Sequence, residues 1–107
     1  MLFCITASYT PSALEAMGKN PNTNRRVAVE QLLTAAGGKL VAMYGTIAEG
    51  PGRLVIFEAD PAVAPAIPAV VAASGAVTNI KMQRLLSGDE IRAIRIADPD
   101  FVAAGTI

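Results

Sequence analysis

The sequence contains no histidine and no tryptophan, and Cys4 is its only cysteine. A chain without histidine lacks the side chain that most often performs acid–base catalysis near neutral pH. A single cysteine excludes an intramolecular disulfide, and without histidine it also excludes a Cys/His zinc site. Because Cys4 lies in an apolar run, we expect a buried structural thiol rather than a nucleophile. The sequence therefore predicts neither a bound metal nor a cofactor.

Neither sign of charge is in excess, because nine lysines and arginines balance nine acidic residues. Arg25-Arg26 is the only adjacent basic pair, and we expect it on the solvated face of a helix. Such scattered basic residues leave no electrostatic footprint for nucleic acid, so we expect no nucleic-acid partner. A net charge of zero also provides little repulsion between copies, which permits self-association.

Long uninterrupted apolar segments are missing as well. The stretch 61–80 carries no charge, but three prolines, a glycine and several polar residues interrupt it, which is not typical of a membrane-spanning helix. The first residues lack the basic region of a secretory signal and turn polar by Thr6. We therefore expect a cytoplasmic protein with no membrane partner.

What the chain does contain is a large share of aliphatic residues and alanine. With 107 residues, 52% of them hydrophobic, it can bury a core without metal or disulfide support. No linker or internal repeat divides it. We expect one α+β domain over 1–107, with a core over about 2–86 and a C-terminal helix and tail over about 87–107.

Alternation and turn residues predict four strands, over 2–8, 39–46, 53–59 and 77–85. The second and third are expected to form a hairpin through 49–52. Four helices are expected between and after them. One begins at Ser12 as N-cap, and a longer one runs from the cap Asn20-Pro21 to the stop Gly37-Gly38.

The other two helices follow the third and fourth strands. Pro65 and Pro68 predict that the helix after Asp60 begins late or is bent, because proline removes a backbone donor and crowds the preceding turn. The Ser-x-x-Glu pattern at 87–90 is a capping box and predicts a closing helix that ends before Pro99.

The order β-α-β-β-α-β predicts a ferredoxin-like fold, in which a four-stranded antiparallel sheet carries helices on one face. The opposite face would carry apolar residues from the first three strands, and an exposed patch of this kind disfavours a monomer. We therefore expect a homodimer or higher homo-oligomer in which a second copy covers that face.

Several short motifs add to this interpretation. They are Ile5-Thr6, Tyr9-Thr10-Pro11, Gly37-Gly38-Lys39, Tyr44-Gly45-Thr46, Val55-Ile56-Phe57-Glu58-Ala59 and Gly75-Ala76-Val77. In their order and spacing, the chain resembles the GYD-domain family over most of residues 3–91. The resemblance implies a small bacterial protein of unassigned biochemical role, with a fold of the dimeric α+β barrel type.

The tripeptide that gives this family its name is not retained. It falls at Gly50-Pro51-Gly52, so its Tyr and Asp are both absent and no role of theirs carries over. Either the chain is a divergent branch, or the tripeptide mainly shapes the hairpin, which Gly-Pro-Gly can also do.

Two polar residues that flank the predicted hairpin form a candidate ligand site. The Tyr44 hydroxyl and the Arg53 guanidinium would converge on an anionic or carbonyl-bearing ligand, and Tyr9 would join them from the end of the first strand. The alternative is a core tyrosine and a surface arginine. A cavity of about 300 Å³ or more, with Tyr44 and Arg53 pointing into it, would favour the ligand site.

A second polar group lies on the last strand. Asn79, Lys81 and Gln83 recur with a period of two, which places them on one face. There they would line a wet interior if that face is enclosed by a dimer. On an exposed edge strand, Lys81 would instead protect against edge pairing. Asn79 and Lys81 are kept as candidate ligand-binding residues, and no residue is assigned as catalytic.

Two classes of function fit these features. The first is a non-enzymatic homo-oligomeric module that binds a small molecule or a partner protein. The second is a cofactor-independent enzyme of the isomerase or monooxygenase type, as some dimeric α+β barrels are. Without histidine, the second would depend on Tyr9, Tyr44, Glu58 or Lys81 as acid or base.

Overall fold

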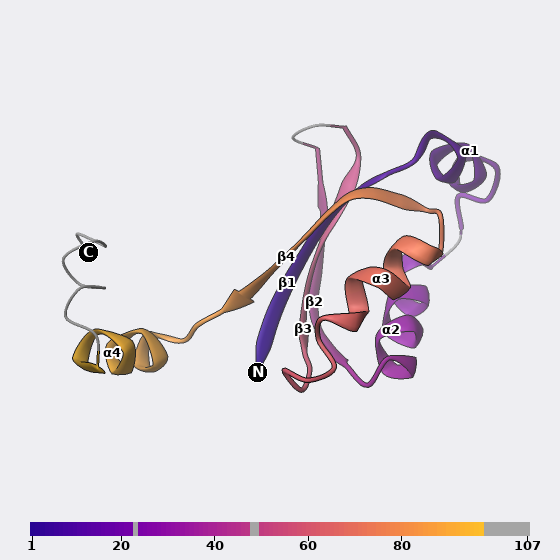
Figure 1. Cartoon of the computed structure of the whole chain (residues 1–107). Coiled ribbons are helices and arrows are strands. Elements are labelled where there is room, and N and C mark those ends of the chain that lie inside the picture. The colour runs from indigo at the N-terminus through magenta and orange to yellow at the C-terminus, as the bar shows by residue number, and fades with distance from the viewer. Residues whose placement is uncertain (23, 48–49, 98–107) are drawn as a thin grey trace.

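The computed structural model describes residues 1–22, 24–47 and 50–97. Its core is a four-stranded antiparallel sheet in the order β2-β3-β1-β4, the strand order of the ferredoxin-like fold. The strands are β1 (Leu2–Tyr9), β2 (Lys39–Thr46), β3 (Gly52–Glu58) and β4 (Val77–Leu85). The helices are α1 (Pro11–Lys19), α2 (Arg25–Ala35), α3 (Ala66–Ala73) and α4 (Gly88–Ala97). As predicted, α2 and α3 lie on the same face of the sheet (Figure 1).

The core lies between that face and the two helices. Successive strand residues point to opposite faces, so Phe3 and Ile5 of β1 face the helices together with Val55 and Phe57 of β3. They pack with Leu33 of α2 and Ile67 of α3, both fully buried. The burial of these aliphatic and aromatic side chains fixes the register, because a slip of one residue would turn all of them to the other face.

The other sheet face is not covered by any described helix, and we call it the open face. The strand register places Cys4 of β1, Leu54 and Ile56 of β3, and Ala42 and Tyr44 of β2 on it. The sequence predicted this apolar face. Tyr44 is 61% exposed, so its ring is available for contact from outside the chain.

Two helix starts differ from the prediction. Thr10, not Ser12, caps α1 by accepting a hydrogen bond from the backbone N–H of Ala13, with Pro11 in the first turn. Asn24, not Asn20, caps α2 by accepting from the N–H of Val27. Asn20 instead ends α1, where its backbone N–H donates to carbonyls of the last turn. Because Thr, Ser and Asn all cap well, neighbouring candidates compete and packing decides between them.

The predicted end of α2 and the predicted late start of α3 are confirmed. Gly37 ends α2 with φ of +86°, a conformation that glycine adopts without strain. A series of turns occupies 61–65, and α3 begins only at Ala66. Pro68 then lies in the first turn of α3, where a backbone donor is not needed.

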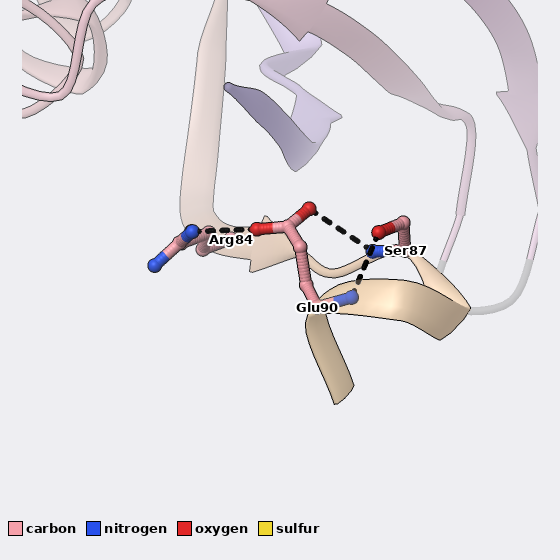
Figure 2. Close-up of polar contacts among 3 residues, drawn as sticks. All are labelled: Arg84, Ser87 and Glu90. Atoms are coloured by element: carbon pink, nitrogen blue, oxygen red, sulfur yellow. Dashed lines mark hydrogen bonds and ion pairs between the residues drawn. The ribbon is translucent and has the colours of Figure 1, made fainter. Parts of the chain in front are cut away.

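A reciprocal capping box holds the start of α4 (Figure 2). The Glu90 N–H donates to Ser87 Oγ at 3.1 Å, and the Ser87 N–H donates to Glu90 Oε1 at 3.2 Å. Arg84, near the end of β4, donates to the other carboxylate oxygen at 2.8 Å. The hydrogen bond from the Ser87 amide is the main cause that lowers the pKa of Glu90. The capping box was predicted, whereas the tail after Ala97 lies outside the described residues.

Helix α4 projects away from the sheet and contacts little of it (Figure 1). None of its residues is buried. Among the residues that the structure describes, no helix is long and apolar enough to cross a membrane.

Candidate small-molecule site

The site is built around Arg53 and Tyr9, which come from neighbouring central strands. Arg53 lies opposite Ala7 in the β1–β3 ladder, so its side chain points to the helix-covered face, as does that of Tyr9 two residues further along. The Arg53 Nε–H donates to the Tyr9 hydroxyl at 2.6 Å, and the guanidinium carbon lies 5.8 Å from the centre of the ring. Together these contacts fix the direction of the guanidinium.

The backbone around this pair leaves room for it. Gly45 of β2 lies opposite Arg53, and a Cβ there would be 3.6 Å from Arg53 Nη1. A larger side chain at this position would compete with the guanidinium for space. The N–H of Tyr9 donates to the carbonyl of Pro51 at 3.0 Å, which ties the end of β1 to the start of β3.

An apolar cavity of about 150 Å³ extends inward from the pair. It lies between the sheet and the helices, with walls from both layers. Ile5, Val55 and Phe57 line it from the sheet, and Val29, Leu32 and Val71 line it from α2 and α3. We call it the inner cavity. Its size is about that of an engineered cavity known to admit benzene.

A larger, open depression of about 500 Å³ adjoins the inner cavity. Arg25 and Arg53 line both of them, and Arg26 and Asn24 line the depression alone. The Arg25 Nε is inaccessible to solvent and has no hydrogen-bond partner among the described residues. No acidic side chain lines either space among the described residues. The mouth of the inner cavity is therefore positively charged.

The structure brings together only part of the predicted site. Arg53 and Tyr9 meet as expected, but Tyr44 lies on the open face, because it pairs with Leu54 whereas Arg53 pairs with Gly45. The partner of Tyr44 is the residue next to Arg53 in β3, and successive residues of a strand point to opposite faces of the sheet. The side chains of Tyr44 and Arg53 therefore lie on opposite faces. Within one chain, Tyr44 therefore does not converge with Arg53, and the predicted pair is wrong in this respect. The inner cavity, at about 150 Å³, is also smaller than the size of about 300 Å³ that was set as favouring a ligand site.

Asn79 and Lys81 lie on the open face as well. They line a shallow depression of about 260 Å³ with Thr6, Ser8 and Thr46. A bulge interrupts the β1–β4 ladder here, and Asn79 adopts φ of +54°, which asparagine tolerates better than most residues. The strand is an edge of the sheet, so both uses suggested for Lys81 remain compatible with its place.

One residue of the candidate site was not predicted from the sequence. Arg25 was interpreted with Arg26 as part of a solvated helix face, yet its side chain is half-buried and reaches the mouth of the inner cavity. The sequence offered no clear signal for this position, because the expected cap was Asn20 whereas the observed cap is Asn24, directly before Arg25. Cys4 is buried as expected, and burial raises the pKa of its thiol.

A comparison with protein-family models decides the family. The GYD-domain model matches residues 3–94. The chain belongs to the GYD-domain family. In this GYD domain the segment Gly50-Pro51-Gly52 holds the hairpin end, because Gly50 has φ of +95° and the Pro51 carbonyl accepts a hydrogen bond from the N–H of Tyr9.

The GYD domain is also similar to a solved structure. This is the 5-chloro-2-hydroxyhydroquinone dehydrochlorinase of Burkholderia phenoliruptrix AC1100, in complex with 2,5-dihydroxybenzoquinone. The two share 20% identity with a TM-score of 0.55, over 83% of this chain and 97% of that one. At this identity the likeness shows the fold alone, and it supports the predicted ferredoxin-like α+β class. No curated protein matched the sequence.

Proposed function

We propose that this GYD domain is a homo-oligomeric module that binds a small molecule in the inner cavity without transforming it. The observation that carries the proposal is an apolar cavity with two half-buried arginines at its mouth. Small-molecule sites typically combine apolar walls with a few fixed polar groups. Here Arg53 is fixed by Tyr9, so part of the site is ordered before a ligand arrives, which reduces the entropic cost of binding.

The polar groups at this site favour binding over catalysis. Arginine stays protonated in proteins and does not exchange protons in a reaction. Tyr9 is then the one group facing the inner cavity, within the described part of the chain, with an exchangeable proton of the kind used in acid–base catalysis. A cofactor-independent enzyme is the second candidate, and it would depend on Tyr9. The similar dehydrochlorinase shows that proteins of this fold include enzymes, but a fold does not determine a function.

We expect small neutral aromatic probes such as benzyl alcohol to bind in the inner cavity and Val29→Phe to abolish that binding. Val29 lines the cavity from α2, and a phenylalanine there would fill a space about the size of one ring. Val70→Phe is the matched control, because Val70 is exposed on α3. Binding is measured by chemical-shift changes on titration. If Val29→Phe binds the probes as the parent does, the cavity is not the site.

The homo-oligomer is supported by the open face and by α4. An apolar open face and a projecting helix with no buried residue both leave surface that a second copy would cover. We expect a dimer or larger species at micromolar concentration, with a buried area above about 1,000 Å². Light scattering that gives the monomer mass of 11.0 kDa throughout this range would contradict the proposal.

The same measurement on Tyr44→Glu tests which face is covered. The side chain is 61% exposed in the single chain, so a charge there leaves the monomer intact but would be costly in a buried interface. We expect this variant to shift toward monomer. Val70→Glu places the same charge on the outer side of the helix layer and should leave the mass unchanged.

A further inference from the structure

We infer that the ligand of this site is a small carboxylic acid, with its apolar body in the inner cavity and its carboxylate at Arg25 and Arg53. The inference rests on the proposed function, because it assumes that the inner cavity is the binding site. It goes further by naming the chemical class of the ligand and the part of the site that selects it.

The first argument is the uncompensated charge at the mouth. Arg25, Arg26 and Arg53 line the outer depression, and no described acidic residue lines it with them. The ion pairs found in the described part of the chain, Glu15 with Lys19 and Arg84 with Glu90, lie elsewhere. In a chain of zero net charge, three cations gathered without a counter-ion favour an anion from outside.

The second argument is the unpartnered Arg25 Nε. A polar atom that is removed from solvent and makes no hydrogen bond costs free energy, and more when it is charged. Buried groups of this kind usually have a partner in the functional state. Because Arg25 lines the junction of the two spaces, a rotation of its side chain toward a bound ligand would bring the Nε to an acceptor oxygen there.

The third argument is the arrangement of polar and apolar surface. Arg25 and Arg53 lie where the apolar inner cavity meets the outer depression. A ligand that satisfies both must have an apolar part of about the size of one aromatic ring, directly followed by an anionic group. A neutral hydrocarbon would leave the arginines unpaired, and a fully polar anion would leave the cavity unfilled.

The fourth argument concerns the anion itself. Guanidinium groups present donors in a planar fork that matches the two oxygens of a carboxylate. Arg53 uses its Nε for Tyr9, which orients the group and leaves its terminal nitrogens to donate. Tyr9 accepts that hydrogen bond and keeps its own O–H for donation. The mouth thus offers several donors, and among the described residues no acceptor carrying a negative charge.

The test compares acids with their neutral isosteres. Benzoate and phenylacetate are titrated calorimetrically into the full chain, beside benzamide and phenylacetamide, at neutral pH and low salt. We expect the acids to bind at least about tenfold more tightly than the amides, because a hydrogen bond to a charged group contributes more than a neutral one. The preference should shrink as salt is added.

Three variants locate the selectivity. Arg25→Gln should weaken binding of the acids roughly tenfold to a hundredfold and leave the amides within about twofold. Arg53→Gln should do the same, but it also frees Tyr9, so Arg25→Gln is the cleaner variant. Arg92→Gln removes the same charge from exposed α4 and should change neither. Thermal melts confirm that each variant is folded.

The outcomes separate this inference from the proposed function. If acids and amides bind equally and Arg25→Gln has no effect, the cavity binds ligands but the assignment to carboxylic acids is wrong. If none of the four compounds binds, both the inference and the binding function fail. Tighter binding of phenyl phosphate than of phenylacetate would move the assignment to phosphate esters and overturn the carboxylate.

Discussion

Gly52→Ala should lower the free energy of unfolding by about 3 kcal/mol, although it adds a single methyl group. Gly52 lies opposite both Ser8 of β1 and Thr46 of β2. A Cβ at this position would collide with the carbonyl oxygen of Ala7 and would lie 2.8 Å from Thr46 Oγ1. The main obstacle is backbone, which cannot rotate away as a side chain can, so the strands must separate locally.

The effect is measured by urea denaturation of the variant and the parent. Gly18→Ala is the matched control, because Gly18 lies in α1 and nothing would lie within 4 Å of its new Cβ. There alanine favours the helix, and we expect a gain of about 0.5–1 kcal/mol. The same methyl group should therefore change stability in opposite directions at the two positions. Equal effects would contradict the close approach at Gly52.

Phe57→Ala should cost about 3–5 kcal/mol of the free energy of unfolding. Phe57 is completely buried, and its ring stacks on Phe3 with 5.7 Å between centroids. Its removal loses the apolar contacts of a whole ring and leaves a void between the sheet and the helices. Because small domains are stable by only about 5–15 kcal/mol, the variant should be close to the limit of folding.

Urea denaturation again provides the measurement, and Ile47→Ala is the control. Ile47 is 89% exposed, so its truncation should change stability by less than about 0.5 kcal/mol. Phe57 also lines the inner cavity. If Phe57→Ala costs less than about 1 kcal/mol, the packing described for this layer is not the packing that stabilises the protein.

The strands could be predicted closely because their signals are local. The predicted bounds of β4 match those observed, and β2 lies between the stop at Gly37-Gly38 and the turn at Gly50-Pro51-Gly52. Alternation and turn residues act over a few positions, so neighbouring sequence contains most of the information. Helix starts were less certain, since Thr10 and Ser12 compete as caps, as do Asn20 and Asn24.

The site was harder to predict, because it depends on register and on burial. The prediction that Tyr44 and Arg53 share a site assumed that residues at the same end of a hairpin lie on the same face. In the observed register, Arg53 is paired with Gly45, the neighbour of Tyr44, so the two side chains lie on opposite faces. Arg25 became a site residue only because α2 packs with its first turn at the end of the sheet. Neither the register nor that packing can be obtained from the composition of the segments involved.

The outward course of α4 has an electrostatic consequence. Val77, the first residue of β4, lines the inner cavity, whereas α4 follows Leu85, the last residue of β4. Nine residues of strand span roughly 25–30 Å at about 3.3 Å each, or about three Debye lengths at physiological ionic strength. Protonation of Glu90, or a charged partner bound at α4, would therefore change the electrostatic potential at a ligand bound to Arg25 very little. Within one chain, coupling between these two ends would have to pass through the pairing of β4 with β1.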